Sequence, residues 1–216
     1  MLSCVCNSVR LLVVLAQAGE ENMLHQNDTM ELEFLPLTPE RWPDFERLFG
    51  KHGAYGGCWC MWWRVTRREF QQQQGEGNRQ AMKAILDSGQ IPGILAYHGD
   101  QPIGWCSVAP REHFSSLERS RVLSRLDQVP VWSIVCLFVA KRYRGRGVAE
   151  ALVRAAVNYV HLQGGKVIEA YPTIPRRGTL APVSSYMGTP AMFERAGFVE
   201  CARPSAGRAI MRYYVG

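Results

Sequence analysis

The chain has 216 residues, of which 47% are hydrophobic and 20% are charged, and its formal net charge is +6 at pH 7. This composition is typical of one globular domain with a large core, and no apolar stretch is long enough to span a membrane. The positive charge alone would suit nucleic acid, but it gathers in one turn and in scattered arginines instead of a stripe. We therefore expect neither nucleic acid nor a membrane as partner.

The first 29 residues differ from the rest of the chain. Arg10 precedes a short apolar run and the small residues Ala16 and Ala18, a pattern that imitates a secretory signal peptide. The apolar run is at the lower limit for such a signal, and a polar segment separates it from Met30. We expect residues 1–29 to be a disordered tail or an upstream extension, residues 30–216 to form one domain, and the protein to be cytoplasmic, with secretion as the alternative.

Apolar periodicity and turn residues predict a series of strands and helices. The expected strands are 31–38, 91–97, 102–108, 131–139, 166–171, 198–203 and 208–214. The expected helices are 39–49, 67–88 with an interruption near Gly75, 111–128, 148–163 and 191–197. A long loop rich in Pro, Gly, Ser and Thr covers residues 172–189, and a loop of that length tends to be functional.

The most informative stretch is residues 131–159, where an apolar strand runs into a basic turn and then into an amphipathic helix. Gly145 and Gly147 allow the backbone to turn sharply, and the free N–H groups of the following helix would face an anion. Positive charge at the same place comes from Lys141, Arg142, Arg144 and Arg146. The spacing fits neither a Walker loop nor a dinucleotide fingerprint. We predict a site for a phosphate-bearing cofactor.

Residues 142–147, Arg-Tyr-Arg-Gly-Arg-Gly, resemble the (Gln/Arg)-x-x-Gly-x-(Gly/Ala) acetyl-CoA signature of the GNAT N-acetyltransferase superfamily. Residues 191–198 resemble the late helix of that family, which ends in Gly-Phe. The resemblance covers roughly residues 31–214. It implies an α/β fold of the α+β kind, with a mixed, mostly antiparallel central sheet of about six to seven strands flanked by helices.

The same resemblance implies acetyl-CoA as cosubstrate and a set of residues that hold it. The backbone of Phe138 and Val139 would bind the pantetheine arm like an added strand. The pyrophosphate would bind to the turn and the start of the helix, formed by Arg142, Tyr143, Arg144, Gly145, Arg146, Gly147, Val148 and Ala149. Many relatives form dimers through their terminal strands, so a homodimer is compatible with the sequence.

The proton-transfer groups are less well marked. Many family members have a tyrosine in the late helix, but Phe193 stands at that position here and cannot donate a proton. Tyr186 is our first candidate for the acid that protonates the departing thiolate, and Tyr171 is the second; for both, the alternative is packing. Glu169 is the first candidate for the base that deprotonates the amine, ahead of His113 or water. Glu169 could equally be an ion-pair partner of an arginine.

A segment with three tryptophans, Tyr55 to Arg64, lies where the family binds the acceptor. Trp59, Trp62 and Trp63, together with Tyr171, are the candidate substrate-binding residues, because aromatic rings hold apolar or cationic amines by stacking and cation–π contacts. Packing under the sheet is the alternative. The Cys-Trp-Cys sequence at 58–60 resembles a bacterial GNAT subgroup. Its spacing is weak support for zinc, and the seven cysteines do not resemble a secreted disulfide framework, so we expect reduced thiols and no metal.

Together these features predict an acetyl-CoA-dependent N-acetyltransferase that acts on a primary amine of a small molecule. Two alternatives stay open: a non-catalytic acyl-CoA-binding or sensing protein, which Phe193 motivates, and a transferase that modifies protein N-termini or lysines.

Overall fold

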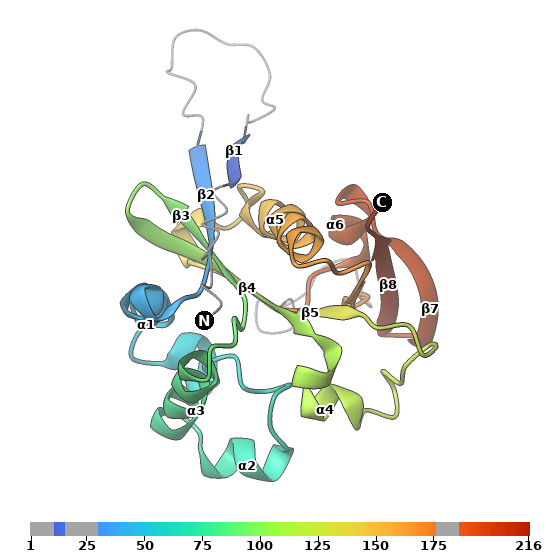
Figure 1. Ribbon diagram of the computed structural model, residues 1–216, viewed down its shortest axis with the longest axis horizontal. Helices are drawn as coiled ribbons and strands as arrows, with labels where there is room; N and C mark the ends of the chain where they lie inside the picture. Colours follow the sequence, from blue (N-terminus) through green and yellow to red (C-terminus); the bar gives the residue numbers. More distant parts are fainter. Residues whose placement is uncertain (1–10, 16–29, 176–185) are drawn as a thin grey trace, which may run out of the picture.

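The computed structural model describes residues 11–15, 30–175 and 186–216 (Figure 1). Within these residues, eight strands form one sheet in the spatial order β1-β2-β3-β4-β5-β6-β8-β7. In chain order they are β1 (Leu11–Leu15), β2 (Met30–Pro36), β3 (Ile94–His98), β4 (Gln101–Pro110), β5 (Trp132–Val139), β6 (Val167–Ala170), β7 (Val199–Ser205) and β8 (Arg208–Tyr214). Neighbouring strands are antiparallel, except that β5 and β6 run parallel. This confirms the predicted fold class.

Helices cover both faces of this sheet (Figure 1). They are α1 (Trp42–Phe49), α2 (Arg67–Gln72), α3 (Glu76–Asp87), α4 (Ser115–Glu118), α5 (Val148–Leu162) and α6 (Pro190–Arg195). One apolar core joins the sheet to α5 and α6, and a second joins it to α1 and α3. In the part of the chain that the structure describes, no helix is both long and apolar enough to cross a bilayer.

The two cores follow from the alternation of side chains along each strand. In β3, Ile94 and Ala96 belong to the core under α5, while Leu95 and Tyr97 belong to the core under α1. All four are at most 5% exposed. A strand that is apolar on both faces is buried between two layers, so the sheet is the middle layer of the domain.

The sheet opens between β5 and β6, and this opening positions the site. β5 pairs with β4 along its whole length, from Trp132 to Val139. It pairs with β6 only over Trp132, Ser133 and Ile134. The edge of β5 from residue 135 to residue 139 therefore has no neighbouring strand on the β6 side.

Two segments differ from the sequence-based expectation. Residues 111–128 were expected to be helical, but the structure has only a short 3-10 turn at Arg111–His113 and one turn of α4. The prediction was wrong because Arg111 is drawn into the protein interior, where it donates a hydrogen bond to the carbonyl oxygen of Leu123 at 2.6 Å. Leu11–Leu15, within the expected tail, forms β1 and pairs with β2. The rest of that tail lies outside the described residues.

Candidate active site

The basic turn predicted from the sequence connects β5 to α5. After Val139 the chain makes a short 3-10 helix, Lys141–Tyr143, and α5 begins at Val148. Gly145 and Gly147 have φ angles of 74° and 79°, in the left-handed region that favours glycine. Gly147 is the N-cap of α5 and provides no side-chain cap. The first amides of a 15-residue helix thus face the turn without a capping side chain.

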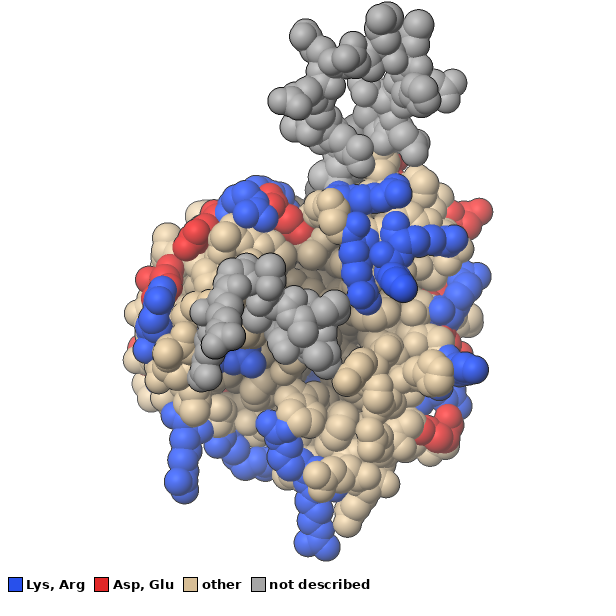
Figure 2. Space-filling model, turned by 180° about the vertical axis from the view of Figure 1, so that it is seen from behind, with Lys and Arg blue, Asp and Glu red and all other residues tan. Residues whose placement is uncertain are grey.

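The charges of this turn are not neutralised by the protein. The four basic side chains of the turn, Lys141, Arg142, Arg144 and Arg146, are exposed, and none of them pairs with a carboxylate in the described residues. Glu150, on the first turn of α5, is bound instead by Arg154 and Arg195. In Figure 1 the turn lies behind β2 and β3, and the rear view in Figure 2 shows a group of Lys and Arg side chains on that side. Helix amides and unpaired cations together form an anion site.

The helix start also clarifies the position of the sequence signature. The pattern (Gln/Arg)-x-x-Gly-x-(Gly/Ala) fits residues 142–147, but it fits residues 144–149 equally well. In the second alignment its first glycine is Gly147, which caps α5. Arg144 then opens the pattern, and its Nε donates to the carbonyl oxygen of Val139 at 2.9 Å, which ties the turn to the end of β5.

The open edge of β5 presents the backbone of Leu137 and Val139. Alternate residues of an antiparallel strand direct their N–H and C=O groups to opposite sides. The Leu137 amide points away from β4, since it donates to the carbonyl oxygen of Tyr186 at 2.6 Å. Val139 has the same orientation, whereas the Phe138 backbone faces Trp105 in β4. This corrects one expectation: Leu137, not Phe138, accompanies Val139 at the open edge.

Tyr186 lies beside this edge, in a half-buried environment. Burial raises the pKa of its phenol, and the charges of Arg208 and Arg67 lower it in part. Its ring packs in one apolar cluster with Trp63 and Cys136. The Trp63 indole N–H is buried and makes no hydrogen bond of good geometry within the described residues, although it lies close enough to lower the pKa of Tyr186. The predicted acid and one predicted substrate-binding residue are therefore neighbours.

Glu169 and Tyr171 are buried in the interior, close to the residues where β5 still pairs with β6. Glu169 is 1% exposed and accepts from Arg111 at 3.0 Å and from Arg212 at 2.9 Å. Tyr171 is fully buried and donates to Glu169 at 2.7 Å. Its hydroxyl also bonds with Ser133 at 2.8 Å. The geometry favours the ion-pair interpretation of Glu169 and removes Tyr171 from direct contact with a substrate.

The three tryptophans have three different environments. Trp59 is 6% exposed and stacks on Phe49 with a centroid distance of 5.7 Å, so it belongs to the core under α1. Trp62 is half-buried, and the guanidinium of Arg67 lies 3.4 Å from the centroid of its ring. Trp63 packs in another cluster, which contains Val135 and Tyr186 and also touches Cys136.

Two further candidates lie outside this group. His113 is exposed on the 3-10 turn that precedes α4. Phe193 is fully buried in α6 and packs edge-on against Phe198 with a centroid distance of 5.1 Å. A tyrosine hydroxyl at this position would be buried, so Phe193 has a packing role here.

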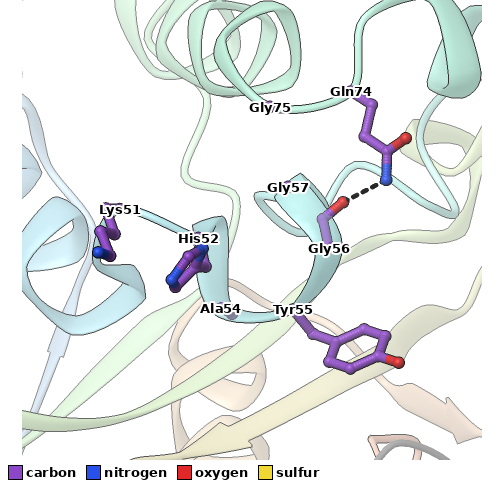
Figure 3. Close-up of a pocket in the computed structure, with 8 residues that line it drawn as sticks. All are labelled: Lys51, His52, Ala54, Tyr55, Gly56, Gly57, Gln74 and Gly75. Carbon is purple, nitrogen blue, oxygen red and sulfur yellow. Dashed lines mark hydrogen bonds between the residues drawn. The ribbon is translucent and has the colours of Figure 1, made fainter.

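A shallow, open pocket lies elsewhere on the surface (Figure 3). It is lined by Lys51, His52, Ala54, Tyr55, Gly56, Gly57, Gln74 and Gly75. Gln74 Nε2 donates to the carbonyl oxygen of Gly56 at 2.6 Å and closes one side. None of the residues at the basic turn or the open edge lines this pocket, so it is separate from the site described above.

Sequence reasoning missed three contributors to the site: Leu137, Cys136 and Arg208. Leu137 faces the open edge with its backbone, and its side chain carries no signal of that orientation. Cys136 could have been found, because it immediately precedes the open-edge residue. Arg208 approaches from β8, and its Nη1 donates to the carbonyl oxygen of Tyr171 at 3.1 Å and to Thr173 Oγ1 at 2.8 Å. No local pattern links it to residues so far away in the chain.

Two solved structures share the fold of this chain. A GNAT-family protein from Desulfovibrio desulfuricans has a TM-score of 0.51 and 18% identity, covering 86% of this chain and 99% of the other. A GNAT-family acetyltransferase from Listeria monocytogenes has a TM-score of 0.52 and 10% identity, covering 86% and 96%. Identities this low show a shared fold alone. The search of curated proteins found no match.

A family model places the chain in the acyltransferase class. The family model for the Acetyltransferase (GNAT) family matches residues 59–179, which include β5, the basic turn and α5. The chain belongs to the GNAT acetyltransferase family, and acetyl-CoA is its cosubstrate.

Proposed function

We propose that this acetyltransferase moves the acetyl group of acetyl-CoA to a primary amine of a small molecule. The observation that carries the proposal is the open edge of β5, which leads directly into a basic turn with two left-handed glycines. An extended amide-bearing arm can add to the edge as a strand would, and phosphates can bind to the turn. Unneutralised charges and a helix start without a side-chain cap fit such an anion.

In this proposal the residues at the edge have distinct roles. The carbonyl of Leu137, whose amide is bonded to Tyr186, and the backbone of Val139 bind the pantetheine arm. The turn from Arg142 to Ala149 binds the pyrophosphate. Tyr186 protonates the departing thiolate, because burial keeps its phenol protonated at neutral pH. The rings of Trp62 and Trp63 line the side of the site where the acceptor binds, and the guanidinium of Arg67 covers the Trp62 ring.

Glu169 has a structural role in this proposal, since both of its oxygens are bound by arginines. Removal of the amine proton then falls to water in the site. The five cysteines in the described residues are free thiols, in keeping with the cytoplasmic location that we propose.

Replacement of Gly145 by valine is expected to weaken acetyl-CoA binding about 30-fold, or about 2 kcal/mol, measured by calorimetric titration. A β-branched side chain strongly disfavours a φ of 74°, so the turn would lose its shape. Gly164→Val is the matched control: Gly164 follows the other end of α5 with a φ of 78°, and an added Cβ meets nothing within 4 Å at either position. Equal binding losses in both variants would contradict the assignment of the turn.

The acceptor is tested with a panel of amines and a thiol-release readout. Turnover on small amines supports the proposal, whereas turnover only on peptides would favour a transferase for protein N-termini or lysines. Tight acetyl-CoA binding without turnover on any amine would favour the acyl-CoA-binding alternative, which Phe193 motivates.

A further inference from the structure

Three cysteines, Cys58, Cys60 and Cys136, belong to the apolar cluster under α1, and a fourth, Cys106, belongs to the core on the other face of the sheet. The proposed reaction uses none of them. Cys58 and Cys60 lie in the Cys-Trp-Cys segment, Cys106 lies on β4 and Cys136 lies on β5. Cys136 on β5 lies opposite Ser107 on β4, two residues after Trp105, so it is on the part of the sheet that Cys60 and Arg64 contact. In the described residues, these thiols do not form a group that could hold a metal ion.

Cys60 is the hydrogen-bond acceptor of this cluster. It is 4% exposed, and its Sγ accepts a hydrogen bond from the buried indole Nε1 of Trp105 at 3.2 Å. Cys136 packs in the same apolar cluster, and its interaction with Cys60 is the largest contribution to the lowered pKa of Cys60. A buried sulfur that accepts a hydrogen bond from an indole N–H is in an environment that favours a thiolate.

Arg64 supplies the matching positive charge. It is 7% exposed and donates to the carbonyl oxygen of Pro92 at 2.9 Å. Its Nη2 also lies 3.4 Å from Ser107 Oγ, and its guanidinium lies over the Phe114 ring. Within the described residues it pairs with no carboxylate, and its buried Nε has no hydrogen-bond partner. A buried guanidinium is costly without an anion, and the Cys60 sulfur is the anion that the structure offers.

The pKa values of the two central thiols shift in opposite directions. The interaction with Cys136 and, to a lesser extent, hydrogen bonds from Trp105 and Ser107 and the charge of Arg64 lower the pKa of Cys60 to about 7. The same interaction and burial raise the pKa of Cys136 well above its ordinary value. Burial also raises the pKa values of Cys58 and Cys106. A thiol with a lowered pKa therefore lies in one cluster with a thiol that stays protonated, the pairing that thiol–disulfide chemistry requires.

The backbone at Cys60 is held in an unusual conformation. Trp59 and Cys60 have φ angles of 42° and 61°, a left-handed conformation that side chains other than glycine seldom adopt. Such a conformation persists only where the surroundings impose it, and here the buried Trp59 ring is stacked on Phe49. The strained turn directs the Cys60 side chain to Trp105 and Cys136.

We propose that Cys60 and Cys136 are an oxidisable dithiol that a peroxide converts to a disulfide. The Cys60 thiolate attacks one peroxide oxygen, the O–O bond breaks, and Cys60 becomes a sulfenic acid while the other oxygen leaves as water after protonation. The Cys136 sulfur then attacks the Cys60 sulfur, an S–S bond forms and a second water departs. Two thiols and one hydrogen peroxide thus give one disulfide and two waters.

The position of Cys136 determines the side from which the oxidant approaches and which segments the disulfide would join. Cys136 is half-buried and packs in one cluster with Tyr186, at the open edge of β5, and the proposal brings the peroxide to the pair from this side. A disulfide would join the Cys-Trp-Cys segment to β5, one residue before the open-edge amide of Leu137. This proposal can be tested without knowing the acceptor and without measuring acetyl transfer.

The test uses full-length protein in which Cys4, Cys6 and Cys201 are replaced by serine. Cys4 and Cys6 lie outside the described residues, and Cys201 is an exposed cysteine on β7. After reduction and removal of reductant, stoichiometric hydrogen peroxide is added, free thiols are blocked under denaturing conditions, and peptides are mapped by mass spectrometry. We expect a loss of two hydrogens and a cross-link between Cys60 and Cys136. Adding Cys136→Ser should instead leave a Cys60 sulfenic acid that dimedone traps.

Two controls make the result decisive. Unmodified wild-type protein is mapped in parallel, so the test stands even if a variant fails to fold. Iodoacetamide, which is bulkier than peroxide, should label wild-type Cys201 at least tenfold faster than Cys60, because Cys201 is exposed. A peroxide-induced bond that involves Cys58 or Cys106 instead, or a Cys60 that stays reduced while Cys201 oxidises, would overturn the proposal.

Discussion

Replacement of Glu169 by glutamine is expected to lower the free energy of unfolding by about 3 kcal/mol. The carboxylate is 1% exposed and bound to Arg111 and Arg212, and removing its charge leaves two guanidinium groups facing a neutral amide. This loss of stability should be at the lower end of the range for breaking a buried ion pair, because each arginine retains another carboxylate. Arg212 still pairs with Asp127 at 2.6 Å, and Arg111 still pairs with Glu118 at 2.6 Å. Chemical denaturation monitored by fluorescence measures the change.

Glu200→Gln is the matched control for this experiment. Glu200 pairs with Arg203 on the surface of β7, where the side chains are 29% and 56% exposed, so its loss should cost less than about 1 kcal/mol. The two interpretations of Glu169 give opposite results. A Glu169→Gln protein that unfolds like the wild type but has lost most of its acetyl transfer would identify Glu169 as the base.

Replacement of Tyr186 by phenylalanine is expected to lower kcat about 100-fold and to leave acetyl-CoA affinity unchanged. The variant removes the phenol but keeps the ring in its apolar cluster with Trp63 and Cys136. It also keeps the Tyr186 carbonyl oxygen that accepts from Leu137, because that atom belongs to the backbone. Steady-state kinetics with thiol release measure kcat, and calorimetry measures the affinity.

Tyr214→Phe serves as the comparison, since its phenol ring is 57% exposed at the end of β8 and should be dispensable for kcat. If Tyr186→Phe turns over like the wild type, the role of Tyr186 is packing. The thiolate would then leave with the help of solvent or of the positive charges nearby.

The parts of the site that were predicted from the sequence are those whose chemistry lies within one short segment. The basic turn carries its glycines, its cations and its helix start within ten residues, so the pattern alone indicated an anion site. The sheet was predictable for a similar reason, because each strand shows its own alternation. Tyr186 was placed beside the site by its position near α6.

The roles of Glu169 and Trp59 could not be predicted from the residues next to them in the sequence. Glu169 is bound by arginines that lie 58 and 43 residues away, and no periodicity in β6 shows that they converge there. Trp59 and Trp63 are four residues apart in one aromatic segment, yet one enters the core under α1 and the other reaches the open edge. The left-handed turn at Trp59 and Cys60 separates them, and such a turn carries no signal when the residues are not glycine.

The parallel pairing of β5 with β6 turns the sheet into a wedge whose vertex lies at Trp132, Ser133 and Ile134. The ion pairs of Arg111, Glu169, Arg212 and Asp127 span that vertex, since they join the segments before β5 to β6 and β8. Three of these four charged side chains are buried, and they tie the strands together at the vertex. We expect tolerance for longer acyl groups to respond to substitutions at the vertex, through the width of the gap at its far end.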